Sequence, residues 1–383
     1  MAPALEGIRI LDLSRTIPGP FCTMILADIG AEVIKVESPD DPLGMLPGQE
    51  KRAAFDFLSR NKKSIGLNLK SPEAREVFYR LVDGADVVME AFRPGAAARL
   101  GVDYETLSHR NPALVYCSLT GFGQAGPYRD LPGHDPNYIS IGGAVALTGD
   151  RNGEPVLIRA ALGDIGSSLH AVIGILTALM ARTRTGKGQY IDVSMTDSVL
   201  SFLTLSLLRY FMDGFVPKRG FPSLSINIWR TKDGKYVSTG LIEPHFWERF
   251  CRALGREELI PYHHAKGEKL GEVHAEIQDA FLSKTRDEWF EIMRQADTCV
   301  SPVLELDEVV NNPHFAARGM FPAYEHPSLG SVTQLGFPIK LSESPAEFRN
   351  FAPAIGQDTD GIMQRLGYNP EEIASLRQSG AVK

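Results

Sequence analysis

The chain has 383 residues, of which 43% are hydrophobic and 23% are charged, and its formal net charge is −7. This length exceeds what one compact core usually holds, so two domains are expected. The negative charge argues against nucleic acid as a partner, because a phosphate backbone requires a basic surface. The four cysteines, Cys22, Cys117, Cys251 and Cys299, form no CxxC pair, which predicts a reducing, cytoplasmic compartment and no zinc site.

The first third of the chain alternates apolar segments with amphipathic ones. The expected elements are strands over 8–13, 31–36, 86–89 and 114–119 and helices over 21–28 and 71–82. Such alternation is typical of a Rossmann-like, doubly wound α/β domain with a parallel sheet. The turn after the first strand lacks GxGxxG, so neither a nicotinamide nor a flavin cofactor is expected.

The rest of the chain changes character after residue 212. A helix is expected from Asp164 to about residue 183, then a strand over 190–194 and one long apolar helix over 199–212. The apolar stretch 165–180 is interrupted by glycine, serine and histidine, which favours a buried helix over a membrane span. Beyond residue 212, Asp233-Gly234 predicts the turn of a hairpin, followed by helices.

These elements predict the domain organisation. We expect a large Rossmann-like α/β domain over 1–205, a small α+β domain over 222–325, a return to the large domain over 340–383, and linkers over 206–221 and 326–339.

Several segments, in order along nearly the whole chain, match one family. They are Gly19-Pro20-Phe21-Cys22, 26–37, Asn61-Lys62-Lys63-Ser64, Phe92-Arg93-Pro94-Gly95, 119–123 and 182–189. With these residues the chain resembles the family III CoA-transferases (the CaiB/BaiF superfamily) and their relatives, the alpha-methylacyl-CoA racemases. The resemblance implies a homodimer whose two chains interlock as rings. It also implies an acyl-CoA substrate, with coenzyme A as part of that substrate and no prosthetic group, metal or membrane.

His134 lies in the segment Gly133-His134-Asp135-Pro136-Asn137-Tyr138. A lone histidine is more often a satisfied surface or core residue than a catalytic one. The segment is similar, however, to the GHD-x-NY segment around the histidine of the racemases, so the resemblance implies a catalytic His134. For Asp135 we expect structural hydrogen bonds.

Asp164 precedes an apolar helix, where an aspartate is the usual N-cap. The catalytic carboxylate of both racemases and transferases matches this position, and a helix N-terminus stabilises negative charge there. Glu243, in Ile242-Glu243-Pro244, would ordinarily be an acid at the start of a helix. It also matches a racemase glutamate that approaches the histidine from the small domain, so the resemblance implies catalytic roles for Asp164 and Glu243.

The cations Arg60, Lys62, Lys63 and Arg93 could simply form a solvated basic face. Guanidinium and ammonium groups also suit the pyrophosphate and the 3′-phosphate of coenzyme A. By resemblance, these four residues and Tyr138 are predicted to line the CoA-binding groove, with Lys62 and Lys63 interchangeable in this role.

Two chemistries fit His134 and Asp164. In the first, the two side chains lie on opposite faces of the alpha carbon of a 2-methylacyl-CoA and exchange its proton through an enolate. In the second, Asp164 attacks the thioester, and CoA passes to a carboxylic acid through an aspartyl intermediate. His134, Glu243 and the lack of a glycine-rich segment in 218–228 favour the racemase. Asp164-Ile165-Gly166-Ser167-Ser168 departs from the racemase Asp-x-Gly-Gly-Gly and favours the transferase, which remains the alternative.

Overall fold

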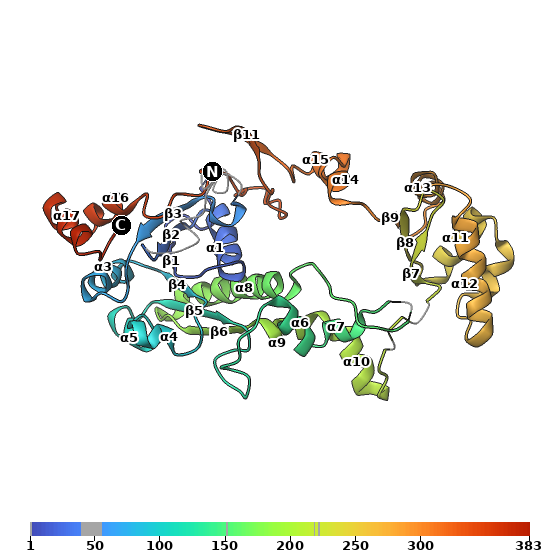
Figure 1. Cartoon of the computed structure of the whole chain (residues 1–383), viewed down its shortest axis with the longest axis horizontal. Coiled ribbons are helices and arrows are strands. Elements are labelled where there is room, and N and C mark those ends of the chain that lie inside the picture. The colour runs from blue at the N-terminus through green and yellow to red at the C-terminus, as the bar shows by residue number, and fades with distance from the viewer. Residues whose placement is uncertain (1, 40–55, 151, 218, 221–222) are drawn as a thin grey trace. The chain divides into compact units, whose positions relative to one another are not determined.

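The computed structural model describes residues 2–39, 56–150, 152–217, 219–220 and 223–383. Contacts within the chain separate two units. The first unit comprises Met1–Leu147, Leu157–Pro217 and Arg318–Lys383, and the second comprises Thr148–Val156 and Lys218–Ala317. Segments from both ends of the chain therefore build the first unit (Figure 1).

A six-stranded parallel sheet forms the centre of the first unit. Its strands are β1 (Arg9–Asp12), β2 (Glu32–Glu37), β3 (Lys62–Gly66), β4 (Val87–Glu90), β5 (Val115–Thr120) and β6 (Tyr190–Ser194). Their order is β3-β2-β1-β4-β5-β6, and every neighbouring pair is parallel. The order reverses between β1 and β4, and at such a switch point doubly wound sheets open a crevice beyond the carboxyl ends of their strands. The predicted α/β fold is confirmed.

Helices cover both faces of this sheet. The helices of the first unit are α1 (Pro18–Asp28), the 3₁₀ helix η2 (Phe57–Ser59), α3 (Pro72–Asp83), α4 (Ala96–Leu100), α5 (Tyr104–Arg110), α6 (Asp135–Ile141), α7 (Ala144–Leu147), α8 (Leu162–Thr185), α9 (Met195–Phe202), α10 (Thr204–Asp213), α16 (Thr359–Arg365) and α17 (Pro370–Gln378). Successive strand residues face opposite sides: Ile10 packs with Cys22 of α1 and Ile175 of α8, whereas Leu11 packs with Phe78 of α3. This alternation follows from the two-residue period of a strand.

Helix α8 is long and apolar enough, by length and composition, to cross a membrane. Within the first unit it packs against α1, β5 and β6, and Ala171 and Ile175 are fully buried there. These contacts make α8 a central helix of the α/β layer, as its interrupted apolar pattern predicts.

The start of α3 illustrates how the sequence sets an element boundary. Ser71 Oγ accepts a hydrogen bond of 3.3 Å from the Ala74 N–H, and Pro72 occupies the first helical position, where its missing N–H costs nothing. Val77 and Phe78 then turn the apolar face of the helix into the core. The predicted helix over 71–82 is confirmed.

The predicted single helix over 199–212 is wrong. The chain leaves the helical path at Leu203, which separates α9 from α10. Val199 of α9 is buried in a small cluster with Ile139 and Ala144, whereas none of the described residues of α10 is buried. A continuous apolar sequence thus conceals two helices with different surroundings.

The C-terminal segment is fixed to the edge strand β3 and the residues before it. Asn61 adopts a left-handed backbone conformation with φ 62°, and its side-chain oxygen accepts hydrogen bonds from the N–H groups of Arg349 and Asn350. The N–H of Lys383 donates to the carbonyl of Gly66. The hairpin of β10 (Ala323–His326) and β11 (Gly330–Thr333) also belongs to this returning segment.

The second unit is an α+β structure with a three-stranded antiparallel sheet in the order β7-β8-β9. Its elements are β7 (Ile226–Arg230), β8 (Tyr236–Gly240), α11 (Pro244–Leu254), the 3₁₀ helix η3 (Glu257–Tyr262), α12 (Gly267–Phe281), α13 (Arg286–Gln295), β9 (Val300–Pro302), α14 (Leu306–Val310) and α15 (Pro313–Ala317). The predicted Asp-Gly hairpin joins β7 to β8, with Gly234 at φ 78°. Trp229, Trp247 and Phe281 form the centre of the core.

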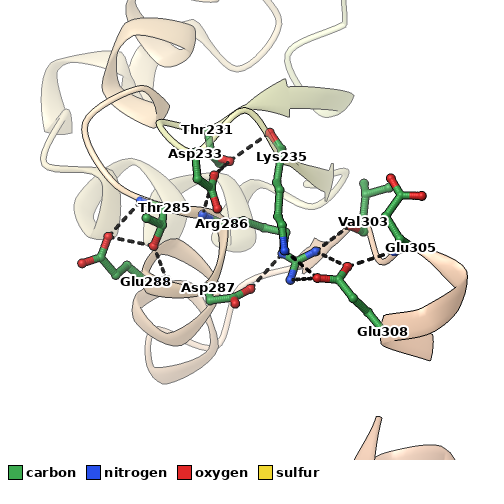
Figure 2. A network of polar contacts seen from close by, with 10 residues as sticks. All are labelled: Thr231, Asp233, Lys235, Thr285, Arg286, Asp287, Glu288, Val303, Glu305 and Glu308. Atoms are coloured by element: carbon green, nitrogen blue, oxygen red, sulfur yellow. Dashed lines mark hydrogen bonds and ion pairs between the residues drawn. The ribbon is translucent and has the colours of Figure 1, made fainter. Parts of the chain in front are cut away.

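A polar network ties the parts of the second unit together (Figure 2). The buried guanidinium of Arg286 donates to both carboxylate oxygens of Glu308 at 2.6 and 2.9 Å and to the Val303 carbonyl at 3.0 Å. Lys235 reaches the same carboxylate at 2.6 Å. The start of α13 is thereby joined to α14 and, through Glu308, to the turn before β8.

Candidate active site

A cavity of about 570 Å³ opens at the carboxyl ends of β1, β4 and β5, on either side of the switch point of the sheet. Its walls are formed by Thr16, Ile17, Pro18, Ala91, Phe92, Arg93, Pro94, Leu119, Thr120, Gly121, Phe122, Arg129, Leu131, Pro132, Gly133, His134, Asn137, Tyr138, Asp164 and Met195. All of these residues belong to the first unit. The fold therefore places the cavity where doubly wound sheets bind their ligands.

His134 and Asp164 lie in the wall of this one cavity. His134 occupies the N-cap position of α6 and is exposed. Its backbone N–H donates a hydrogen bond of 3.0 Å to Asn137 Oδ1, which fixes the turn that carries the imidazole. The structure thus brings together the two residues that the sequence places thirty positions apart.

The expectation that Asp164 caps its helix is wrong. Helix α8 begins at Leu162, so Asp164 occupies the third helical position. The capping carboxylate is that of Asp135, whose Oδ1 accepts hydrogen bonds from the N–H groups of Gly163 at 2.7 Å and Asp164 at 3.0 Å. Asp135 therefore has the structural role expected for it, and it links the start of α8 to the turn that carries His134.

The surroundings of Asp164 raise the pKa of its carboxyl group towards neutral pH. Partial burial raises the pKa of Asp164 to about 6, the negative charge of Asp135 adds to the rise, and His134 opposes it. A carboxyl group with a pKa near 6 is present in both protonation states around neutral pH. It can therefore take a proton from a substrate and return one, as general acid–base catalysis requires.

Tyr138 packs against the turn that carries His134. Its ring packs against Gly121 and Gly133, where an added Cβ would lie 2.4 and 2.7 Å from the ring. The hydroxyl donates to the carbonyl of Gly133, and Phe122 packs edge-on at 5.3 Å. Burial raises the pKa of Tyr138, so its hydroxyl stays protonated as a donor, and its contact with CoA remains a prediction.

The structure separates the predicted CoA-binding cations into two groups. Arg93 is exposed, lines the cavity and donates from Nη2 to the Asp130 carbonyl at 2.8 Å. Lys63 is not among the lining residues described for the cavity and forms an ion pair of 2.7 Å with Glu32.

Arg60 and Lys62 require a correction, because both are buried in structural ion pairs. The Lys62 ammonium is fully buried and contacts Asp12 at 3.0 Å and Thr23 Oγ1 at 2.7 Å. Arg60 contacts Asp28 through two hydrogen bonds of 2.6 and 3.1 Å. Neither cation is available to a phosphate here, so the basic segment at β3 reflects the need to neutralise buried aspartates.

Burial and the Lys62 ammonium act in opposite directions on Asp12. Desolvation raises its pKa, but Lys62 and the hydroxyls of Ser14 and Thr23 outweigh that effect, so the pKa of Asp12 lies below its ordinary value. Asp12 ends β1 and Thr23 lies on α1. The charged pair therefore holds the turn that supplies Thr16, Ile17 and Pro18 to the cavity.

Glu243 belongs to the second unit, where it occupies the N-cap position of α11. It is exposed, and among the described residues its side chain makes no capping hydrogen bond. Its catalytic role stays a prediction. In the segment 218–228, whose composition favours the racemase, residues 218, 221 and 222 lie outside the described residues.

Sequence reasoning missed one charged residue of the cavity, Arg129. It follows Tyr128 in the long connection between β5 and α6, and no local pattern marks it. Only the tertiary fold brings Arg129 and Arg93 into the wall of one cavity. Within the part of the chain that the structure describes, no group of three His, Cys, Asp or Glu side chains could hold a metal ion.

Comparison with known proteins gives consistent relatives over the full length. A formyl-CoA:oxalate CoA-transferase of Rhodopseudomonas palustris (strain BisA53) is 33% identical, over 100% of this chain and 98% of the relative. An alpha-methylacyl-CoA racemase of Homo sapiens is 34% identical, over 99% of this chain and 98% of the relative. Among solved structures, a CAIB/BAIF family protein from Brucella suis superposes with a TM-score of 0.82 at 30% identity, covering 96% of this chain and 100% of that one.

A family model described as CoA-transferase family III matches residues 5–359. This match extends over both units. The predicted resemblance is confirmed: the chain belongs to CoA-transferase family III.

Proposed function

We propose that the chain racemises or epimerises the alpha carbon of a 2-methylacyl-CoA by two-base proton transfer. The main observation that supports this proposal is that His134 and Asp164 line the same cavity and that the pKa of Asp164 is about 6. A base with a pKa near the working pH combines a sufficient ionised fraction with a useful driving force for proton transfer.

The reaction would proceed through an enolate. The thioester carbonyl acidifies the alpha C–H bond, one of the two side chains removes the alpha proton, and the electron pair of that bond moves onto the carbonyl oxygen. The other side chain then delivers a proton to the opposite face, and the carbonyl re-forms. His134 and Asp164 exchange these roles in the reverse direction, so each serves one enantiomer.

The binding of the CoA portion is supported by Arg93. Arg93 is exposed in the cavity wall, and among the described residues its guanidinium makes one hydrogen bond, which leaves further donors for a phosphate. Tyr138 contributes its ring to the same wall. Glu243 is proposed as a third acid–base group, on the basis of its sequence context alone.

The second candidate is CoA transfer between an acyl-CoA and a carboxylic acid, with Asp164 as the nucleophile. Two observations favour it: the segment Asp164-Ile165-Gly166-Ser167-Ser168 differs from the racemase pattern, and a relative of similar identity is named a formyl-CoA:oxalate CoA-transferase. In this chemistry the Asp164 carboxylate attacks the thioester carbonyl and CoA leaves as a thiolate. The thiolate then attacks the aspartyl carbonyl of the resulting anhydride, which releases the donor carboxylate and leaves an aspartyl-CoA thioester on Asp164. The incoming acid attacks this thioester and releases the thiolate again, and the thiolate attacks the acyl carbonyl of the new anhydride, which gives the product acyl-CoA and restores the Asp164 carboxylate.

One pair of assays on the wild-type protein separates the two chemistries. The protein is incubated with a 2-methylacyl-CoA in deuterated water, and separately with acyl-CoA and labelled carboxylic acids. Uptake of deuterium at the alpha carbon without exchange of CoA supports proton transfer. Exchange of CoA without deuterium uptake would refute the racemase and establish the transferase.

We also propose that the protein is a homodimer, with the interlocked arrangement implied by the resemblance. Support comes from apolar side chains exposed on two helices of the first unit: Leu205 and Phe211 of α10 are each 77% exposed, and Ile173 of α8 is 60% exposed. Burial of such side chains against a second chain would remove apolar surface from water. Sedimentation equilibrium at micromolar concentration should give the dimer mass, and a monomer would contradict the proposal.

A further inference from the structure

We propose that Arg129 binds an anionic oxygen group of the substrate in the cavity that contains His134 and Asp164. This inference rests on the proposed use of a CoA thioester. It adds a contact residue that lies outside the set predicted from the sequence.

The side chain of Arg129 is built into the cavity wall with an unused donor. Its Nε is shielded from water and has no hydrogen-bond partner in the described part of the chain. Its ion pair with Asp130 is long, at 3.7 Å between Nη1 and Oδ2. A shielded N–H group without an acceptor is costly. An acceptor that arrives with the substrate would remove this cost.

The loop that carries Arg129 is held in place by other residues. Arg93 Nη2 donates to the Asp130 carbonyl at 2.8 Å, and the Leu131 N–H donates to the Tyr128 carbonyl at 2.9 Å. The ring of Tyr128 packs against Phe122, with centroids 5.9 Å apart. These contacts fix the backbone on both sides of Arg129 and so keep its side chain at the cavity wall.

The charge of the cavity also points to an anionic ligand. The whole chain has a formal charge of −7, yet the described residues of the cavity wall include two arginines, Arg93 and Arg129, against a single Asp or Glu, which is Asp164. Thr120 adds a buried hydroxyl that has no partner among the described residues. An occupant with oxygen acceptors would satisfy both the cations and this hydroxyl.

The planar guanidinium group of an arginine can donate two parallel hydrogen bonds to a phosphate or to a carboxylate. The anion therefore has two possible sources, a phosphate of the CoA moiety or a carboxylate on the acyl group or the acceptor acid. Both share the same chemistry at Arg129. The two sources are distinguished by varying the CoA portion and the acyl portion of the substrate separately.

The first test measures CoA binding by calorimetry. Arg129→Met keeps the unbranched apolar part of the side chain and removes the charge. Arg129→Lys keeps the charge but cannot donate two parallel hydrogen bonds. The matched control is Arg99→Met, because Arg99 is an exposed arginine of α4 that is not among the described lining residues. For a phosphate contact, the Kd of CoA should rise about 10- to 100-fold in Arg129→Met, less in Arg129→Lys, and stay unchanged in Arg99→Met.

The second test compares KM values for three thioesters: a neutral acyl-CoA, the same acyl group on N-acetylcysteamine, and an acyl-CoA with a terminal carboxylate. A phosphate contact raises KM for both CoA thioesters in Arg129→Met but not for the N-acetylcysteamine thioester. A carboxylate contact raises KM for the carboxylated substrate only. Unchanged Kd and KM for every probe would overturn the inference.

The two proposals fail in different ways. Wild-type protein that binds CoA while Arg129→Met binds it equally, with all KM values unchanged, contradicts the role of Arg129 alone. Wild-type protein that binds CoA but gives neither deuterium uptake nor CoA exchange contradicts the proposed function, and the calorimetry still decides on Arg129. Absence of CoA binding by the wild-type protein would overturn both.

Discussion

Replacement of Asp164 by Asn should stabilise the folded protein at pH 8 while it removes activity. The pKa of Asp164 is about 6 against an ordinary value of 3.8, and each pKa unit corresponds to about 1.4 kcal/mol. The whole shift in the pKa of Asp164 would correspond to about 3 kcal/mol of unfolding free energy. Because the carboxyl group is only partly buried, solvent screening reduces this to about 1–2 kcal/mol, or a rise of about 2–4 °C in Tm.

The sign of this effect depends on pH. A carboxyl group whose pKa is raised in the folded state stabilises the fold fully below pH 3.8, and this stabilisation is lost as the pH rises through 6. At pH 8 the wild-type protein contains the ionised, partly buried carboxylate, whereas the amide side chain of the variant is neutral at every pH. The advantage of Asp164→Asn should therefore shrink as the pH falls from 8 towards 5.

Thermal denaturation at several pH values tests this prediction, with Asp197→Asn as the control. Asp197 occupies the same third position in α9 that Asp164 occupies in α8, but it is exposed. Its replacement should lose a weak interaction with the helix dipole and give no stabilisation. A lower Tm for Asp164→Asn at pH 8, or a difference from wild type that is independent of pH, would refute the reasoning.

Three further predictions concern residues around the cavity and in the second unit. Lys62→Met should destabilise the protein by about 3–5 kcal/mol, because it leaves Asp12 buried without its cation; equilibrium unfolding measures this loss. Gly121→Ala should impair catalysis, since the new methyl group would displace the Tyr138 ring beneath the His134 turn; kcat and a folding check by circular dichroism report it. Arg286→Met should lower Tm, with a loss of about 1–3 kcal/mol from its hydrogen bonds to Glu308.

Each of these predictions has a contrary outcome. A Lys62→Met protein of wild-type stability with a raised KM for acyl-CoA would restore Lys62 to the CoA groove. Full activity in Gly121→Ala would show that the Tyr138 ring can shift without moving His134. An unchanged Tm in Arg286→Met would show that the network in Figure 2 adds no net stability.

The large elements of the fold could be predicted because their causes are local. The Ser71-Pro72 start of α3 and the Asp-Gly hairpin in the second unit depend on residues within a few positions of each other. The break at Leu203 could not be predicted in this way. Apolar residues continue on both sides of it, and tertiary surroundings distinguish α9, which buries Val199, from α10, in which no described residue is buried.

Site residues could be predicted where they lie in a specific sequence motif, but not where burial determines the role of the residue. His134 and Asp164 share one cavity, in line with the pattern of the segments that contain them. The cap of α8 comes from Asp135, which is distant in sequence. Lys62 looks like a ligand-binding cation in a basic segment, but the pairing of β2 with β3 beside Asp12 buries it. Such long-range pairings lie beyond any local pattern.

The most direct test of the central claim is deuterium uptake at the alpha carbon of the separate R and S enantiomers of a 2-methylacyl-CoA, measured with the wild-type protein and with His134→Ala. If His134 and Asp164 are two bases on opposite faces, His134→Ala should slow uptake from one enantiomer by about 10²–10⁴-fold and affect the other much less. Equal rates from both enantiomers in His134→Ala, at the wild-type level, would contradict the two-base account.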